Sequence, residues 1–278
     1  MPTVTAFGTF FGFTTPITDT YFKGNEQLDA EQITSYELGY YAEFFKRKML
    51  LDVKLFREEI TNVIDTVRRI GGLISSRATP DGGEATYELN ITYFDALRGT
   101  FEGEDAFHID RYLASQTIVM ALEGIPALYI QALLGASNDI EGVEKSGQNR
   151  AINRHRWDYE DLTARLDDPE STQSRVMNEL LRRIAVRRRQ KAFHPNATQF
   201  TLQIDERLFG LWRQSLERDQ SIFALHNVSD DALVIAPQAI NLIDGANWVD
   251  LLSGEKIDPT GTEIRFAPYQ CRWISNRG

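Results

Sequence analysis

The sequence lacks several features that would assign it to particular compartments or classes. It has a single cysteine, Cys271, so no intrachain disulfide can form, and a reducing compartment fits. No stretch reaches the ~18–20 apolar residues of a membrane-spanning helix, and the first residues lack the basic-then-apolar pattern of a secretory signal. The net charge of −10 disfavours nucleic-acid binding, because phosphate contacts need clustered Lys and Arg. We therefore expect a cytoplasmic protein that binds neither nucleic acid nor a membrane.

Residue patterns for metal or nucleophilic chemistry are also lacking. The histidines show no ligand spacing such as H-E-x-x-H, so we predict no metal and structural roles for His108, His155, His194 and His226. Cys271 lies in an apolar strand pattern, which indicates a buried thiol. The arginines of 182–189 are predicted on a solvated helix face. Asp139, Glu141 and Glu144 are interpreted as a solvated loop rather than an acid/base pair.

What the sequence does contain is a hydrophobic pattern that changes near residue 70. From Ile33 to Ile60 apolar and polar residues alternate on both sides of a basic turn at 46–48. Alternation of this kind predicts two strands of a β-hairpin. Residues 73–86 mix Ser, Thr, Pro and Gly, and are predicted to form a loop.

A region with helical spacing follows. Apolar residues recur at helical intervals in 107–123 and in 171–190, where Ser171 is placed to cap the helix. The short apolar run 126–131 predicts a buried strand. Residues 135–157 are predicted to form a long polar loop.

From residue 199 apolar and polar residues again alternate with a period of two. Five short runs separated by turn residues predict a small antiparallel β-domain. Trp212, Trp248 and Trp273 fall in or near these runs and are predicted to lie in the core rather than to form a sugar platform. A helical region followed by a compact β-domain is consistent with the end of an α/β enzyme.

A series of specific motifs runs through the second part of the chain. They are GGLIS at 71–75, YELNITYFDAL at 87–97, RYLASQ at 111–116, GIPALY at 124–129, EGVEKSGQNRAINR at 141–154, LHNVS at 225–229, DLLSG at 250–254 and APYQ at 267–270. With these motifs in this order, residues 72–278 resemble the C-terminal part of the sucrose-phosphorylase branch of glycoside hydrolase family 13.

The resemblance implies a (β/α)₈ barrel and the reversible phosphorolysis of an α-glucoside to glucose 1-phosphate. The partners implied are an α-glucoside and inorganic phosphate as co-substrate, without a cofactor. Enzymes of this family transfer the glucosyl unit with retention of its anomeric configuration, using an Asp nucleophile, a Glu acid/base and a third Asp. Two carboxylates ~5 Å apart are the physical minimum for this reaction. The match begins just after the seventh barrel strand. We therefore expect no catalytic residue in this chain and no turnover from it alone, so its standing as an enzyme stays open.

Three residues match substrate-binding positions of the family. Tyr87 and Glu88 match its acceptor-site loop, where a phenol can donate to phosphate and a carboxylate can accept from hydroxyls. With Glu88, the loop resembles that of relatives that phosphorolyse glucosylglycerate, glucosylglycerol or a phosphorylated sucrose. Plain sucrose phosphorylases carry Gln at this position. Arg150 matches an Arg that lines the glucosyl pocket. The simpler alternatives are a surface loop with an ordinary Tyr, and a loop Arg paired with Asp139 or Glu144.

The first part of the chain carries a different set of motifs, GNEQLDAE at 24–31, TSYELGY at 34–40, LDVKLF at 51–56 and ITNVI at 60–64. On these motifs, residues 1 to about 66 resemble the C-terminal barrel strands of a TonB-dependent outer-membrane receptor. The two patterns meet between residues 60 and 72. We interpret the chain as a junction of two unrelated coding fragments.

The sequence as a whole predicts an α/β protein made of a C-terminal remnant of a (β/α)₈ barrel, a small antiparallel β-domain and an unrelated preceding β-hairpin segment. The expected domains are 1–68 (receptor-like hairpin), 69–195 (partial barrel with the acceptor-site loop) and 196–278 (β-domain). The alternatives are a non-catalytic fusion remnant and a fragment of a TonB-dependent receptor. The sequence leaves open the oligomeric state and whether a second chain supplies the missing barrel strands.

Overall fold

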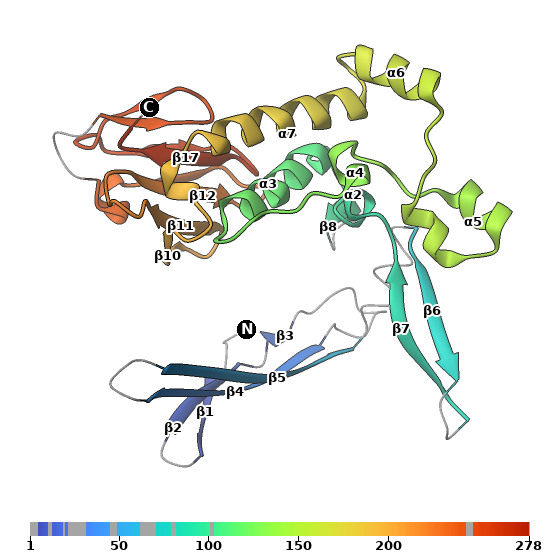
Figure 1. Cartoon of the computed structure of the whole chain (residues 1–278), viewed down its shortest axis with the longest axis horizontal. Coiled ribbons are helices and arrows are strands. Elements are labelled where there is room, and N and C mark those ends of the chain that lie inside the picture. Colours follow the sequence, from blue (N-terminus) through green and yellow to red (C-terminus); the bar gives the residue numbers. More distant parts are fainter. Residues whose placement is uncertain are drawn as a thin grey trace. The chain divides into compact units, whose positions relative to one another are not determined.

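The computed structural model describes residues 5–10, 13–18, 20–21, 32–44, 49–61, 71–78, 82–100, 103–242 and 247–277 (Figure 1). The chain divides into two compact units, Met1–Leu89 and Asn90–Gly278. Within the described ranges, none of the helices has the length and apolar character needed to cross a membrane. The three predicted domain boundaries stay predictions.

Long antiparallel strands dominate the first unit. Its first five strands are β1 (Thr5–Phe10), β2 (Phe13–Thr18), β3 (Thr20–Tyr21), β4 (Gln32–Phe44) and β5 (Met49–Thr61). β4 and β5 are 13 residues each and pair in continuous register, with Gln32 opposite Thr61 and Phe44 opposite Met49. The strands of the predicted hairpin are therefore confirmed, while its basic turn lies outside the described residues.

The predicted loop at 73–86 is wrong. Residues Leu73–Ala78 (β6) and Glu84–Asn90 (β7) form a two-stranded sheet. The Asp-Gly pair at 81–82 is a hairpin signal between two strand-compatible runs, and Gly82 has φ +84°, which glycine adopts readily. The turn residues mark the middle of a hairpin, not a long loop.

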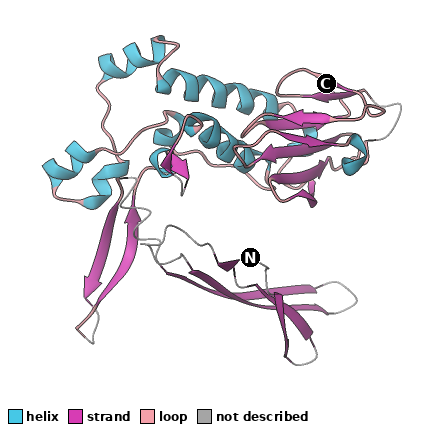
Figure 2. Cartoon of the chain, turned by 180° about the vertical axis from the view of Figure 1, so that it is seen from behind, coloured by secondary structure: helices cyan, strands magenta, loops and turns pink. Residues whose placement is uncertain are grey.

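Helices open the second unit (Figure 2). They are α2 (Tyr93–Ala96), α3 (His108–Ala121), α4 (Ile130–Leu133), α5 (Ile140–Ser146), α6 (Tyr159–Asp167), α7 (Thr172–Arg188), and the 3₁₀ turns η1 (Asn149–Asn153) and η2 (Lys191–Phe193). Between α2 and α3, the short strands β8 (Gly99–Thr100) and β9 (Gly103–Glu104) pair with each other. α3 and α7 confirm the two predicted helices. The Ser171 hydroxyl accepts a hydrogen bond from the Ser174 N–H at 3.0 Å, which confirms the predicted cap.

Two predictions in this region are wrong. The run 126–131 is not a strand, because residues 125–129 form no regular element and α4 begins at Ile130. The polar loop 135–157 contains α5 and η1. The Asp139 carboxylate caps α5 by accepting from the Gly142 N–H at 2.8 Å, and Gly147 ends it at φ +64°.

A six-stranded antiparallel sheet forms the C-terminal part of the second unit. Its strands run in the order β10 (Thr198–Asp205), β11 (Leu208–Gln214), β12 (Ser221–Asn227), β17 (Cys271–Ser275), β14 (Trp248–Asp250) and β15 (Lys256–Ile257). A separate pair joins β13 (Leu233–Ile235) to β16 (Ile264–Phe266), and the turn η3 (Pro237–Ile240) follows β13. The antiparallel β-domain is confirmed. Residues 263–275, predicted as a single strand, hold the two strands β16 and β17, and β14 and β15 were not predicted.

The sheet is buried on both faces. Along β12, Ile222 and Ala224 join a core made with α3 and α7, while Phe223 and Leu225 join a second core beneath β13 and β16. This alternation is the period-two geometry of a strand. Trp273 is fully buried in the first core and Trp248 is buried in the second, as predicted.

Two arginines of α7, Arg183 and Arg187, face inward, which contradicts the solvated position predicted for them. The Arg183 guanidinium donates to the Leu113 carbonyl at 3.0 Å, and Arg187 Nε donates to the Met120 carbonyl at 2.7 Å. Both carbonyls belong to α3, so these side chains join the two helices. The other three arginines of the predicted group, Arg182, Arg188 and Arg189, are exposed, as predicted.

Cys271 is buried, as predicted, and His226 also lies in the interior. Burial raises the pKa of the Cys271 thiol to about 11, so the thiol is protonated at neutral pH. His226 is fully buried, and its Nδ1–H donates to the Phe209 carbonyl at 3.0 Å. Burial, opposed by this hydrogen bond and assisted by the nearby Arg183 charge, lowers the pKa of His226 to about 4.

Replacing Leu180 by Ala should destabilise the second unit by about 2–5 kcal/mol, because Leu180 is fully buried between α7 and the sheet. The neighbouring Leu181→Ala is the matched control, since Leu181 is 44% exposed and should change stability by no more than about 0.5 kcal/mol. Urea unfolding followed by tryptophan fluorescence measures this selectively, because all four tryptophans lie after residue 90. Equal losses from both variants would contradict this packing.

The stability of the second unit should fall as the pH drops from about 6.5 towards 4. In that window the unfolded chain protonates His226 while the folded chain, with its pKa lowered to about 4, does not. The loss attributable to this group reaches about 3 kcal/mol below pH 4. His226→Gln should remove that part of the acid sensitivity. The measurement is the free energy of unfolding of both proteins against pH, and parallel curves would contradict the assignment.

Candidate functional site

Tyr87 and Glu88 lie in β7 of the first unit rather than in a loop. Tyr87 is 55% exposed, and Glu88 is half-buried. Successive strand residues point to opposite faces, so the phenol and the carboxylate project to different sides of the hairpin. A phenol can donate to a phosphate oxygen and a carboxylate accepts from hydroxyls.

Arg150 belongs to the other unit, in the 3₁₀ turn η1, and its side chain is exposed. The carboxylate of Asp139, one of the two partners considered for Arg150, lies 3.2 Å from Nδ1 of His155. The Glu141 carboxylate pairs with Lys145 one helical turn along α5. The segment around Arg150 is therefore organised by its own neighbours.

A buried carboxylate fixes the start of this segment. Asp95 is fully buried, and its Oδ2 accepts from the Asn138 N–H at 2.7 Å while Arg98 lies 2.8 Å from its Oδ1. In return the Asn138 side-chain oxygen accepts from the Thr92 N–H at 2.8 Å. These reciprocal bonds join residues 92–95 to the beginning of α5, more than forty positions later in the chain.

Polar contacts of Gln131 fix the other end. Its amide nitrogen donates to the His155 carbonyl at 2.7 Å, and its amide oxygen accepts from Trp157 Nε1 at 2.9 Å. The rings of His155 and Trp157 meet edge-on with centroids 4.5 Å apart. The Asp139 N–H also donates to the Ile152 carbonyl at 2.8 Å, so η1 is held between two anchored ends.

A polar hollow of about 460 Å³ lies along this segment. Its charged lining comes from Asp139, Glu141, Lys145, Arg154, His155 and Arg156. Cationic donors beside carboxylate acceptors suit a ligand with several hydroxyls or a small anion. Arg154, four residues after Arg150, is the family-motif arginine that lines this hollow.

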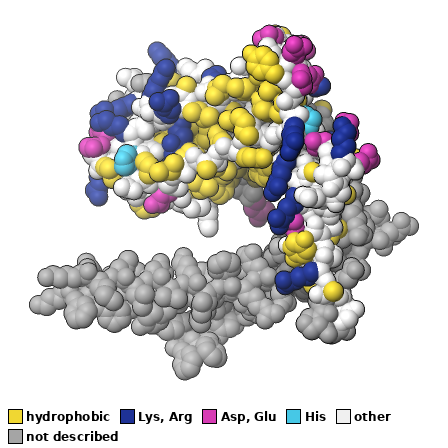
Figure 3. Space-filling view, turned by 45° about the vertical axis from the view of Figure 1, so that its right-hand side comes forward, with side chains coloured by type: hydrophobic (Ala, Val, Ile, Leu, Met, Phe, Trp, Pro, Cys, Tyr) yellow, Lys and Arg dark blue, Asp and Glu magenta, His cyan; other side chains and the backbone are white. Residues whose placement is uncertain are grey.

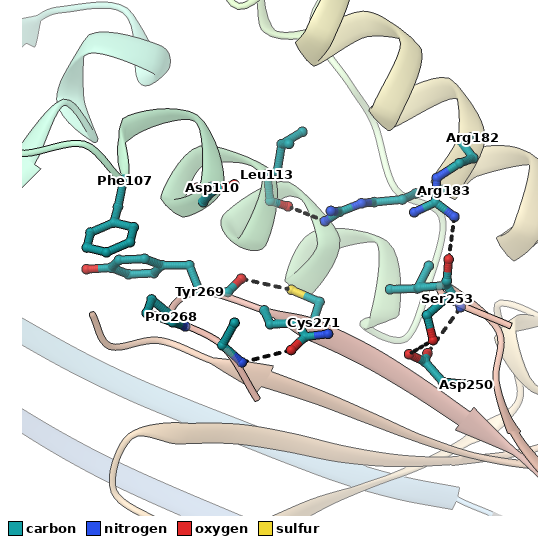
Figure 4. A pocket seen from close by; sticks show the side chains of 13 residues that line it. Phe107, Asp110, Leu113, Arg182, Arg183, Asp250, Ser253, Pro268, Tyr269 and Cys271 are labelled. Carbon is teal, nitrogen blue, oxygen red and sulfur yellow. Dashed lines mark hydrogen bonds between the residues drawn. The ribbon is translucent and has the colours of Figure 1, made fainter. Parts of the chain in front are cut away.

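A second cavity, of about 410 Å³, lies between α3, α7 and the sheet (Figure 4). Its polar groups are largely engaged in the fold. Arg182 and Arg183 donate to the carbonyls of Leu252 and Leu113, and Asp250 accepts from the Ser253 hydroxyl at 2.7 Å. These contacts hold the two helices and the sheet together around the cavity, and we assign it no ligand.

No metal site appears in the described residues, where no three His, Cys, Asp or Glu side chains gather as ligands. Sequence reasoning missed the link between Thr92, Asp95 and Asn138. A signal for part of it was present, because Thr92 and Asp95 have the spacing of a capping box and the Thr92 hydroxyl accepts from the Asp95 N–H at 3.2 Å. The partner Asn138 carried no such signal.

Comparison with curated proteins matches the chain to sugar phosphorylases. Glucosylglycerate phosphorylase of Spirochaeta thermophila is 36% identical over 232 residues, covering 78% of this chain and 38% of that protein. The Escherichia coli glucosylglycerate phosphorylase is 35% identical over 217 residues, covering 78% and 37%. Sucrose 6(F)-phosphate phosphorylase of Thermoanaerobacterium thermosaccharolyticum is 29% identical over 145 residues, covering 52% and 27%. The chain spans less than two fifths of the length of the curated relatives it matches.

Among solved structures, AmyP in complex with maltotriose superposes with a TM-score of 0.51 at 16% identity, covering 68% of this chain and 40% of AmyP. The AmyP complex with maltose gives the same TM-score. These neighbours are α-amylase-family (β/α)₈ barrels, which confirms the predicted fold class.

A family model described as TonB dependent receptor-like, beta-barrel, matches residues 2–174. This range includes the strands of the first unit and also continues into the second, where residues 93–167 contain helices α2 to α6. The strand pattern of such a family therefore fits the first unit and disagrees with the helical part of the match. Both predicted resemblances are confirmed.

Removing the Asp95 carboxylate should release the segment that carries Arg150. Asp95→Ala deletes hydrogen bonds to a charged acceptor, each worth about 1.5–3 kcal/mol, so local opening should become ten- to a hundredfold more frequent. Arg150, Arg154 and Arg156 are exposed trypsin sites in this segment. The rate of cleavage there, identified by mass spectrometry, measures the effect.

The matched control is Asp110→Ala, because Asp110 is an exposed carboxylate in the first turn of α3. That variant should be cleaved at the wild-type rate. A wild-type rate in Asp95→Ala would show that the segment is held by other contacts.

Proposed function

The chain belongs to the TonB dependent receptor-like β-barrel family, whose model matches residues 2–174, and we propose a separate function for its C-terminal part. Residues 70–278 are the C-terminal part of a retaining α-glucoside phosphorylase. This proposal is supported by the homologues of that part, which are glucosylglycerate and sucrose phosphorylases of glycoside hydrolase family 13. The reaction proposed is the reversible transfer of a glucosyl unit between an α-glucoside and inorganic phosphate. The observation that carries the proposal is the 36% identity held over 232 residues. The compartment proposed is the cytoplasm, which fits the single buried thiol Cys271.

The proposed donor is glucosylglycerate. Two of the most similar curated relatives bear that name, and Glu88 is the residue expected for such donors. The proposed roles follow from side-chain chemistry: Tyr87 donates to phosphate, Glu88 accepts from the hydroxyls of the leaving acceptor, and Arg150 donates to the glucosyl hydroxyls. The polar hollow beside α5 supports the last of these roles, because it supplies further donors along the same segment.

We propose that this polypeptide does not complete the reaction by itself. Retention requires two carboxylates about 5 Å apart that face one anomeric carbon. The buried carboxylates of the described second unit, Asp95 and Asp250, are both engaged in the fold. Asp95 accepts from the Asn138 N–H, and Asp250 accepts from the Ser253 hydroxyl and the Trp273 N–H at 3.0 Å. Their engagement in the fold supports the proposal.

A second candidate function concerns the first unit alone, as a piece of a TonB-dependent receptor. The continuous 13-residue pairing of β4 with β5 supports it, together with the family match. On this hypothesis two coding fragments meet between residues 60 and 72. Sequencing of the transcript across codons 55–75 tests whether the joint is natural, and reads that stop at the joint would contradict it.

The purified chain, incubated with glucosylglycerate and phosphate, should release no glucose 1-phosphate above background. Sucrose and glucosylglycerol should also give none, because the carboxylate pair that retention needs is not supplied. A coupled assay for glucose 1-phosphate provides the measurement.

The E. coli glucosylglycerate phosphorylase is the positive control in the same assay. Turnover by the 278-residue chain that is lost in Arg150→Ala would overturn the proposed inactivity and support the proposed role of Arg150. Turnover that is unaffected by Arg150→Ala would contradict both.

A further inference from the structure

A pocket of about 460 Å³ lies where the C-terminal end of α7 meets the β-domain. Its size falls within the range of small-molecule sites, about 300–1,000 Å³. Three cationic and two apolar side chains line it, with two amides: Arg189, Lys191, Arg277, Val186 and Leu251 are the cationic and apolar ones. Among the described residues of this lining there is no carboxylate, although the chain has a net charge of −10. A cationic pocket on an acidic protein points to an anionic ligand.

A carboxylate beside the pocket holds two of the cations in place. Oδ2 of Asp219 lies 3.1 Å from both Lys191 Nζ and Arg277 Nη1, and its Oδ1 accepts from the Ser215 hydroxyl at 2.7 Å. The Ser215 hydroxyl and Lys191 lower the pKa of Asp219, so this carboxylate is ionised at neutral pH. An ammonium has three N–H donors and a guanidinium has five. Lys191 and Arg277 therefore keep donors for a ligand after pairing with Asp219.

The third cation has no partner of its own. Within the part of the chain that the structure describes, the exposed Arg189 guanidinium makes no hydrogen bond or ion pair. The end of α7 is capped without it, because the Val186 carbonyl accepts from the Arg189 N–H at 3.2 Å and from the Gln190 side chain at 3.1 Å. All five donors of the Arg189 guanidinium are thus available.

The dipole of α7 is a simpler explanation for cations at this place. The C-terminal end of a helix carries a partial charge of about −0.5, which a nearby cation stabilises. Arg187 and Arg188 already lie in the last turn of α7 and meet that need. Arg277 follows β17, far along the chain, and has no part in ending the helix. The helix dipole therefore does not explain why three cations gather around one pocket.

The charge of the pocket matches a phosphate monoester. The three cations and Asp219 together leave two positive charges without a negative partner. A phosphate monoester carries about −1.5 to −2 at pH 7 and offers three acceptor oxygens, whereas a carboxylate carries a single charge. Guanidinium groups bind phosphate oxygens through two parallel N–H donors, and an ammonium adds a point charge.

The amides make the pocket a preformed one. Gln220 is buried, its amide nitrogen donates to the Gln190 side-chain oxygen at 2.7 Å, and its own oxygen accepts from the Ala192 N–H at 3.0 Å. These bonds fix the wall between the cations, so a ligand meets donors that are already in place. A preformed site lowers the ordering cost of binding.

The apolar side chains indicate what accompanies the phosphate. Val186 and Leu251 line the same pocket as the cations, and a sugar ring offers C–H groups to such a wall and hydroxyls to solvent. On the face that Figure 3 shows, Lys and Arg side chains lie in small separate groups among apolar and uncharged ones. A nucleic acid would need a continuous basic surface. The setting therefore favours a small organic phosphate.

We propose that this pocket binds a sugar phosphate, with the phosphate on Arg189, Lys191 and Arg277 and the sugar ring against Val186 and Leu251. None of the three cations is among the residues proposed above to bind the glucoside. Binding here is measured without turnover, so the inference does not depend on the proposed function.

The experiment is isothermal titration calorimetry of the purified 278-residue chain with glucose 6-phosphate, inorganic phosphate and glucose in separate runs. Glucose 6-phosphate should bind at one site per chain and at least tenfold more tightly than inorganic phosphate, and glucose should give no binding heat. Arg189→Ala should weaken the binding of glucose 6-phosphate at least tenfold, because it removes charge-assisted hydrogen bonds. Arg277→Ala, at the end of the chain, should cause a similar loss.

The matched control is Arg188→Ala. It removes the same charge from an adjacent exposed residue that does not line the pocket, and it should bind like the wild type. Three outcomes overturn the proposal: no binding of glucose 6-phosphate, equal affinity for glucose 6-phosphate and inorganic phosphate, or equal losses in Arg188→Ala and Arg189→Ala. Binding that is lost in Arg150→Ala and kept in Arg189→Ala also overturns it, while supporting the sugar-binding role proposed for Arg150.

Discussion

The C-terminal end of α3 is the point on which the second unit depends. A helix leaves its last carbonyls without intrahelical donors. Here two guanidinium groups supply them. Arg187 donates to the Met120 and Gly124 carbonyls, and the fully buried Arg213 donates to Ala121 at 2.7 Å and to His194 at 3.0 Å. The positive charges also complement the helix dipole. Burial lowers the pKa values of both arginines, which nevertheless stay charged.

These bonds explain why the segment after α3 is placed so firmly. Arg187 comes from α7 and Arg213 from β11, so a single helix end is held to both the helical layer and the sheet. The chain leaves this end directly into residues 125–129. Its apolar side chains are therefore held at the surface and cannot turn inwards. A flexible tail with the same sequence would collapse onto the nearest core.

The sequence predicts elements well where one local pattern decides the structure. α3, α7 and the β4–β5 pair each have a sustained period and clear ends. It fails at 126–131, where a strand needs a neighbour that local pattern cannot supply, and at 135–157, where capping by Asp139 and Gly147 outweighs polar composition. The inward turn of Arg183 and Arg187 also escaped prediction, because charge alone does not reveal that unpaired carbonyls lie within reach. Asn138 was missed for the same reason: its partners are distant in sequence.

The roles proposed for Tyr87, Glu88 and Arg150 cannot be derived from local chemistry alone. Tyr87 and Glu88 lie on a hairpin and Arg150 lies on a 3₁₀ turn of the other unit. A phenol, a carboxylate and a guanidinium are common on protein surfaces, and each can donate or accept hydrogen bonds to many ligands. Binding of one sugar is a joint property of residues from separate segments, so no single local pattern can specify it. The proposed roles therefore depend on the motif around each residue rather than on its side chain alone.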